Sequence, residues 1–264
     1  MINVIIPAYN CTKTLSKTLA SLVAQTDSNF EVIVVDDCST EDIKSIVDDY
    51  ANKLSIIYIR NEKNMGCGMS RQVGIDNATQ KFITFLDSDD MFMPYTVETF
   101  NSVVDANPDL ECLHSYFYEQ NTADGNPILV LRTEGYTWCH GKLYNVESIR
   151  KHGIRNSPEI RWADDAYFNS ICTELMETRL IKIPTILWVY NKESVTLRPD
   201  PERDKLKHDD FFRAIQLSSE FVLTKKDQVE HLEGTIDGYI KKHVLNEQEI
   251  EKAKQLLNYI RRDS

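Results

Sequence analysis

The sequence lacks the features that would place it in a membrane or outside the cell. No apolar run approaches the ~20 residues of a membrane-spanning helix. The first ten residues, MINVIIPAYN, have neither the basic start nor the long apolar stretch of a secretion signal. Its six cysteines are scattered, with no close pair at metal-ligand spacing, so we expect reduced thiols and no zinc site. These absences predict a cytoplasmic protein, with peripheral attachment to the inner face of a membrane as an open alternative.

Positive charge is also scarce. The chain has 30 lysine and arginine residues against 41 aspartate and glutamate residues, a net charge of −11. Such a chain repels phosphate backbones, so general nucleic-acid binding is not expected. Hydrophobic residues make up 42% of the 264 positions, which excludes wholesale disorder. This length allows one large domain, or one domain with a helical appendage.

The first half of the sequence alternates short apolar runs with amphipathic ones. Four runs rich in Val, Ile and Phe have the length of strands: 3–7, 30–36, 55–60 and 81–87. Between them, apolar residues repeat at three and four positions, the spacing of helices, over 15–23, 43–50 and 69–78. Nearly continuous apolar strands that alternate with helices predict an α/β fold with a parallel sheet covered on both faces.

The pattern changes after about residue 110. Two strands, 111–118 and 128–132, flank a turn signal at Asp124-Gly125. We then expect helices at 146–152 and 165–177 and an apolar run over 180–190 that Pro184 interrupts. The segment PDPERD, residues 199–204, is interpreted as a linker.

These patterns divide the chain into two parts. We expect a domain over 1–198, made of a nucleotide-binding half (1–109) and an acceptor-binding half (110–198), followed by a helical region over 199–264. Within that region, 246–262 carries one apolar stripe. The helical region could bind the membrane surface, pack on the domain or join two subunits, and we favour a homo-oligomer.

Polar residues follow three of the four early strands: Pro7–Asn10, Asp36–Thr40 and Asp87–Asp90. Ligands of open parallel sheets bind beyond the carboxyl ends of the strands, so these segments are candidates for a nucleotide pocket. Ser39 and Thr40 could equally be helix caps.

The fourth strand leads directly into three carboxylates, in FITFLDSDD. In an extended chain Asp87 and Asp89 would face the same side, and like charges so placed repel unless a cation lies between them. Mg²⁺ and Mn²⁺ accept oxygen ligands from one or two such carboxylates, whereas zinc would need His or Cys nearby. The alternative is a solvated acidic loop.

Asp164 and Asp165 form a second carboxylate pair. A neighbouring carboxylate raises the pKa of one member, which suits a general base. The same pair could instead cap the helix that follows.

Taken together, these segments resemble a family 2 glycosyltransferase of the GT-A fold, and the likeness covers residues 2–198. The residues that carry it are VIIPAYN (4–10), the L-x-x-x-L-x-S-L-x-x-Q-T pattern (15–26), EVIVVDDCST (31–40), NMGCGMSRQVGIDNA (64–78), FITFLDSDD (82–90), WCHGKLY (138–144), HGIR (152–155) and WADDAYF (162–168). Their order and spacing are specific to the family but not to one substrate.

The resemblance implies a Rossmann-like, mostly parallel nucleotide-binding sheet with helices on both faces, and a UDP-sugar site on it. It places the nucleotide-sugar-binding residues at Pro7, Ala8, Tyr9, Asp37, Asn64, Arg71, Asp87, Ser88 and Asp89. Tyr9 would stack near the base, and Asp37 would accept from uracil N3–H, which favours UDP over GDP or CDP. Asp89 would bind Mn²⁺ or Mg²⁺, and the planar guanidinium of Arg71 suits phosphate.

The resemblance also implies a catalytic base at Asp165. Asp164 stands where the family usually has Glu, and its shorter side chain is expected on the acceptor side together with Trp138. His140 is as plausible a structural residue as a functional one. The segment 190–198 is similar to a loop that closes over the diphosphate.

The implied activity is a metal-dependent, inverting transfer of a sugar from a UDP-sugar to a hydroxyl of a glycan, a teichoic-acid-like polymer or a lipid-linked acceptor. Three alternatives stay open. A sugar nucleotidyltransferase would normally have a Gly-rich loop, and residues 7–17 contain no glycine. A non-catalytic relic of the fold would not need Asp165. A transferase acting on modified nucleobases fits poorly with the charge of −11.

Overall fold

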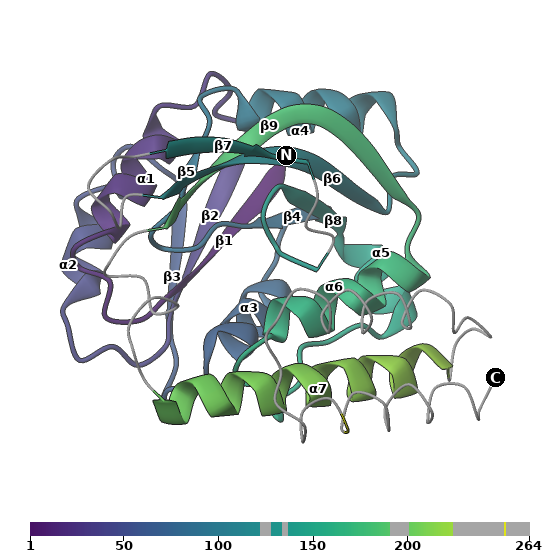
Figure 1. The fold of residues 1–264 in the computed structure, drawn as a ribbon. Helices are drawn as coiled ribbons and strands as arrows, with labels where there is room; N and C mark the ends of the chain where they lie inside the picture. Colours follow the sequence, from purple (N-terminus) through teal and green to yellow (C-terminus); the bar gives the residue numbers. More distant parts are fainter. Residues whose placement is uncertain (122–127, 134–136, 191–200, 224–250, 252–264) are drawn as a thin grey trace.

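The computed structural model describes residues 1–121, 128–133, 137–190, 201–223 and 251. Within these residues, nine strands form one sheet in the order β3-β2-β1-β4-β8-β6-β9-β5, and β7 pairs with β6 (Figure 1). The expected α/β fold is confirmed. None of the helices in the described part is long and apolar enough to cross a membrane.

The first half has the predicted alternation of strands and helices. Its elements are β1 (Ile2–Ala8), α1 (Leu15–Val23), β2 (Phe30–Asp36), α2 (Ile43–Asp48), β3 (Ile56–Arg60), α3 (Cys67–Asp76) and β4 (Phe82–Phe85). The pairs β1–β2, β2–β3 and β1–β4 are all parallel. All seven residues of β1 are buried, which is expected of a central strand covered on both faces.

The second half extends the sheet with antiparallel and parallel strands. Its elements are β5 (Met91–Phe92), α4 (Thr96–Ala106), β6 (Cys112–Asn121), β7 (Ile128–Arg132), β8 (Lys142–Asn145), α5 (Val146–His152), α6 (Asp164–Leu175), β9 (Thr178–Tyr190) and α7 (Pro201–Leu223). β8 runs antiparallel to both β4 and β6, whereas β9 runs parallel to β6. The sequence analysis did not anticipate β5, α4 and β8, of which β5 and β8 are too short for a clear period.

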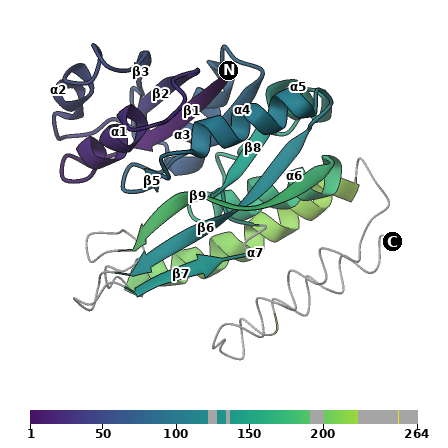
Figure 2. The same cartoon turned by 90° about the horizontal axis from the view of Figure 1, so that it is seen from above.

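Helices cover both faces of the sheet, and alternate strand residues separate two cores. On one face, Val4 and Val34 pack with α1, α2 and α4 through residues such as Leu19 and Phe100. On the other face, Ile5 and Val35 pack with α3, α5, α6 and α7. Figure 2 shows α6 and α7 side by side beneath β6 and β9. The sheet edge where β1, β2 and β4 end is therefore held from both faces.

Two expectations about the end of the domain are wrong. Pro184 does not interrupt the last apolar run, because β9 continues through it and the irregularity is confined to two register shifts against β6, one on each side of Tyr116. The segment 199–204 is not simply a linker, because α7 begins at Pro201, a position where the missing N–H costs a helix nothing. Ala214, Leu217 and Phe221 of α7 join the core that contains α6, so this helix packs on the domain itself. The stripe at 246–262 lies outside the described residues apart from Glu251.

Gly74 allows α3 to lie directly against β1. A Cβ at this position would meet Ile5 Cγ2 at 2.3 Å. We expect Gly74→Ala to lower the free energy of unfolding by about 1–3 kcal/mol, the usual cost of overpacking, as measured by urea denaturation. Ile5→Ala removes the clashing atoms, so the double variant should lose less than the sum of the single losses. Losses that simply add would contradict this account.

Candidate active site at the carboxyl edge of the sheet

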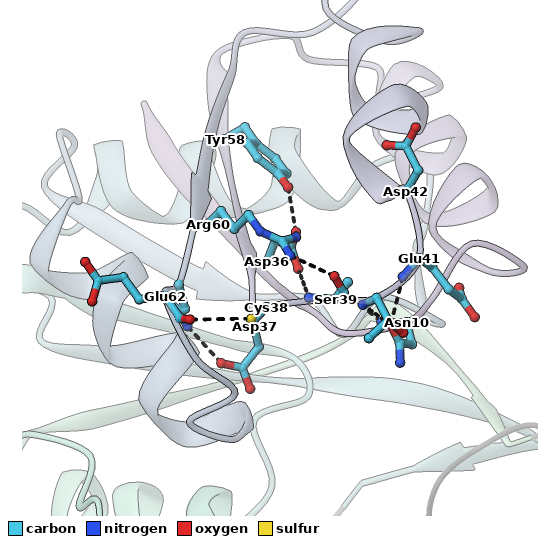
Figure 3. A network of polar contacts seen from close by, with 12 residues as sticks. Asn10, Asp36, Asp37, Cys38, Ser39, Glu41, Asp42, Tyr58, Arg60 and Glu62 are labelled. Carbon is cyan, nitrogen blue, oxygen red and sulfur yellow. Dashed lines mark hydrogen bonds and ion pairs between the residues drawn. The ribbon is translucent and has the colours of Figure 1, made fainter.

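A hydrogen-bond network organises the end of β2 (Figure 3). Tyr58 donates to Asp36 Oδ2 at 2.6 Å, the Ser39 N–H donates to Asp36 Oδ1 at 2.8 Å, and Arg60 forms an ion pair with the same carboxylate. Burial alone would raise the pKa of Asp36, but these hydrogen bonds hold it below its usual value. Asn10 links the end of β1 to this turn, because its Oδ1 accepts from the Thr40 N–H at 2.8 Å. Asp36 therefore fixes the shape of the turn that follows β2 at the carboxyl edge of the sheet.

Asp37, the predicted uracil partner, holds the loop that leads into α3. Its Oδ1 accepts from Asn61 Nδ2 and from the Met65 N–H, both at 2.9 Å, and its Oδ2 accepts from the Gly66 N–H at 2.8 Å. The side chain is buried at the start of the turn. A carboxylate with two oxygens can accept further hydrogen bonds, so this position is compatible with a base but does not test that role.

The other predicted nucleoside residues lie around the same edge. Pro7 and Ala8 end β1 and are buried, whereas the neighbouring Tyr9 is 49% exposed. An exposed aromatic ring beside a buried strand end is available for stacking. Asn64 accepts a hydrogen bond from Arg161 Nη2 at 2.8 Å, which connects the loop before α3 with the segment before α6.

The carboxylates after β4 are arranged differently from the expectation. β4 ends at Phe85, and the Asp90 N–H donates to the Asp87 carbonyl at 3.0 Å, so these residues form a turn and not an extended strand. Asp87 therefore lies close to Asp90. Ser88 lies beside the Cys11 thiol, and Asp89 is partly buried.

Asp87, Asp90 and His140 form a group whose ligand atoms all lie within 4.8 Å of one another. His140 Nε2 lies 3.1 Å from Asp90 Oδ2, and the Val189 N–H donates to Asp90 Oδ1 at 2.9 Å. Burial raises the pKa of Asp90, whereas the nearby carboxylates outweigh burial and raise that of His140. Two carboxylates and an imidazole, with Asp89 in the same turn, fit a divalent ion such as Mn²⁺ or Mg²⁺. The sequence argument against zinc, that no histidine lies nearby, is wrong, because His140 belongs to this group.

The second acidic pair lies at the start of α6 and points toward the same region. Asp165 Oδ1 accepts from the Ala166 N–H at 2.8 Å, and Asp164 forms an ion pair with Arg71 of α3. Arg71 Nη2 also donates to Asp87 Oδ1 at 2.6 Å. Ala163, directly before the pair, has a φ of 60°. A non-glycine residue in this left-handed region is strained, which is typical of functional sites.

The pKa values of these carboxylates differ according to their neighbours. Burial raises the pKa of Asp164 to about 6, against the effect of Arg71, and it raises the pKa of Asp165 as well. Burial would also raise the pKa of Asp87, but the charge of Arg71 holds it below its usual value. Carboxylates with separated pKa values are the usual arrangement of an acid–base site.

Aromatic side chains border this site on the side of β6 and β9. Trp138 and Trp188 lie 5.4 Å apart between ring centroids, and His140 stacks on Phe117 at 5.3 Å. Lys142 donates to the Trp138 carbonyl, and burial lowers its pKa to about 8. Partly exposed tryptophans beside acids are suited to contact with sugar rings, which have apolar faces.

Some functional candidates were not singled out from the sequence. In the sequence Asp90 is one acid of a run, and an extended Asp87–Asp90 segment does not predict the turn that brings it to His140. Trp188 had no motif around it. Asp210 of α7 accepts from the N–H groups of Arg161 and Trp162 at 3.0 and 2.8 Å, and so holds the segment before Asp164.

The fold and the site define a class. A parallel α/β half with polar groups at its carboxyl edge is the arrangement of a nucleotide-binding sheet, and the acidic groups beside it are those that the resemblance to the GT-A fold implies.

Comparison with known proteins agrees with this class. The family model described as "Glycosyl transferase family 2" matches residues 3–155. The chain therefore belongs to glycosyl transferase family 2.

Several relatives are similar to parts of the chain. An "Uncharacterized glycosyltransferase" of Haemophilus influenzae is 40% identical over 114 residues, 43% of this chain and 38% of that protein. Glycosyltransferase GlyG of Streptococcus pneumoniae is 30% identical over 183 residues, 69% of this chain and 56% of that protein. The chain thus matches between 38% and 56% of these relatives' length.

A further relative is similar to this chain both in sequence and in its solved structure. Poly(ribitol-phosphate) beta-N-acetylglucosaminyltransferase TarS of Staphylococcus aureus is 32% identical over 181 residues, 63% of this chain and 31% of that protein. The structure of its residues 1–349 in complex with UDP-GlcNAc superposes with a TM-score of 0.78 at 20% identity, covering 99% of this chain and 81% of that one. This likeness shows the fold.

Proposed function

We propose that the protein transfers a sugar from a UDP-sugar to a hydroxyl group with inversion at the anomeric carbon. The observation that carries the proposal is the convergence of two acidic groups at one sheet edge. Asp87 and Asp164 come from segments far apart in the chain, yet both contact Arg71. The acids of the turn after β4, which include Asp87, lie where a nucleotide diphosphate would bind. The pair at the start of α6 supplies Asp165, a base with a raised pKa.

The donor is a UDP-sugar, bound at the ends of β1 and β2. Tyr9 stacks on the base, while Asp37 accepts from uracil N3–H. Asn64 and Ser88 remain candidates for contact with the rest of the nucleotide, and Asp87 for contact with ribose or sugar. TarS is named an N-acetylglucosaminyltransferase and has been solved with UDP-GlcNAc, which makes UDP-GlcNAc the first donor to test.

Mn²⁺ or Mg²⁺ is held by Asp89, with Asp87, Asp90 and His140 as neighbours that can share it. When bound, such an ion neutralises charge on a departing diphosphate. Carboxylate oxygens suit both ions, and the imidazole of His140 favours Mn²⁺ over Mg²⁺.

Asp165 takes the proton from the acceptor hydroxyl. The oxygen attacks C1 of the sugar, the bond from C1 to the diphosphate breaks, and UDP leaves. One displacement converts an α-linked donor into a β-linked product without a covalent intermediate. A base with a raised pKa accepts a proton more readily than an ordinary aspartate.

The acceptor is a saccharide or a hydroxyl-bearing polymer that lies against Trp138 and Trp188, with Asp164 beside it. The partly buried tryptophan pair supports this placement. A teichoic-acid-like polymer is the first acceptor to test, because TarS is named for poly(ribitol-phosphate).

Calorimetric titration of UDP, GDP and CDP tests the donor site. We expect UDP to bind in the presence of Mn²⁺ and its affinity to fall about tenfold or more with EDTA. Preference for GDP would overturn the role of Asp37. No binding of any diphosphate would overturn the proposed function as a whole.

A further inference from the structure

Arg71 lies between the two acidic groups of the site. Its side chain is only 6% exposed; Nη2 donates to Asp87 Oδ1 at 2.6 Å, and Nη1 donates to Asp164 Oδ2. The guanidinium lies 5.7 Å from the ring centroid of Phe85, the last residue of β4. One buried cation thus touches the turn after β4, the start of α6 and the sheet between them.

We infer that Arg71 is a positioning residue that fixes the catalytic pair on α6 relative to the donor-binding turn. The inference rests on the proposed function and assigns a different role from phosphate binding. Both terminal nitrogens are already engaged with carboxylates, one each, within the described residues. A guanidinium used in this way orients two separate elements, and two carboxylates already balance its charge, while its buried Nε has no hydrogen-bond partner among the described residues.

The packing around Arg71 is built for this contact. A Cβ on Gly68, one turn earlier on α3, would meet the Asp164 Cβ at 2.6 Å. Only glycine therefore lets α3 and the start of α6 approach closely enough for the ion pair. Asp164 is the neighbour of Asp165, so a shift of Asp164 moves the predicted base with it. Displacement of a reacting group by about 1 Å can cost a factor of about 10² in rate.

The shape of the guanidinium is essential to the inference. Lysine keeps the charge but has one ammonium group, which cannot hold two carboxylates in the geometry of a planar fork. We expect Arg71→Lys to lower the kcat for cleavage of a UDP-sugar, followed as UDP formed, about 100-fold. Its affinity for UDP in the presence of Mn²⁺ should stay within about threefold of the wild-type value. Arg155→Lys is the matched control and should leave kcat unchanged. Arg155 lies after α5 and pairs at the protein surface with Asp76 of α3, the helix that carries Arg71.

A double-variant cycle tests whether Arg71 acts through Asp164. Asp164→Asn should lower kcat, and Arg71→Lys should add little to a chain that already carries this change, because the contact is lost in both. The number of UDP sites per chain, from calorimetry, separates a rate effect from partial unfolding. If Arg71→Lys does not fold, a cycle of Asp87→Asn with Asp164→Asn takes its place. These two aspartates both pair with Arg71, so their effects on kcat should be coupled in the same way.

The results distinguish the inference from its alternatives. If the losses in kcat from Arg71→Lys and Asp164→Asn multiply independently in the double variant, the inference is wrong. It is also wrong if Arg71→Lys keeps the wild-type kcat but binds UDP tenfold or more weakly, because that is the behaviour of a phosphate ligand. A wild-type protein that neither binds UDP nor releases it from UDP-sugars would overturn the proposed function and this inference together.

Discussion

Replacing Asp165 by Asn is expected to lower kcat for sugar transfer about 10³-fold, because an amide cannot accept the proton of the acceptor hydroxyl; general bases typically contribute factors of about 10² to 10⁴. Asn has nearly the same volume as Asp, and Asp165 is only partly buried, so the fold should be retained. UDP affinity, measured by calorimetry, should change less than threefold. A loss of UDP binding equal to the loss of rate would show that Asp165 serves the donor and not the acceptor.

The pH dependence gives an independent check on the same residue. Burial raises the pKa of Asp165, and a base works only when it is deprotonated. We therefore expect kcat/KM to fall as the pH is lowered through this raised pKa, which lies above the value of a free aspartate. The acid limb of the profile should be absent from the residual activity of Asp165→Asn. An acid limb that persists unchanged in the variant would assign the titration to another group.

Replacing Asp89 by Ala is expected to reduce the affinity for UDP in the presence of Mn²⁺ about tenfold, the same loss as removal of the metal, since a bound divalent ion would lose a charged ligand. Without the metal, wild type and variant should bind UDP alike. His140→Gln is the informative comparison, because His140 belongs to the group with Asp87 and Asp90. If His140→Gln abolishes the metal effect and Asp89→Ala does not, the ion is held by that group and the assignment of Asp89 is wrong.

The sequence predicts the first half of the fold well. Apolar runs at strand length, separated by clear helical periods, locate β1 to β4 and α1 to α3 because each local pattern agrees with burial on both faces of the sheet. The two acidic groups were also recognisable, since each places like charges next to one another, which favours a nearby cation or raises the pKa of one member. The resemblance to the family is confirmed by the family model over residues 3–155, a range that ends before the acid pair Asp164 and Asp165.

The sequence does not predict how the side chains meet. Asp90 reaches His140 only because Asp87–Asp90 forms a turn, and an extended chain would have paired Asp87 with Asp89 instead. The two carboxylate partners of Arg71 were not predicted, because no local pattern indicates acids 16 and 93 positions away. The start of α7 at Pro201 depends on tertiary packing against α6, which a run of charged residues and prolines conceals.

The most direct test is to follow the anomeric proton by NMR while the protein cleaves UDP-GlcNAc, UDP-Glc, UDP-Gal or UDP-GalNAc with Mn²⁺ present and water as the acceptor. In this reaction water replaces UDP at C1, and the products are UDP and the free sugar. A single displacement with Asp165 as base predicts that the β-anomer appears first, before mutarotation, and that Asp165→Asn abolishes the signal. First appearance of the α-anomer, or equal cleavage by the variant, would contradict the account.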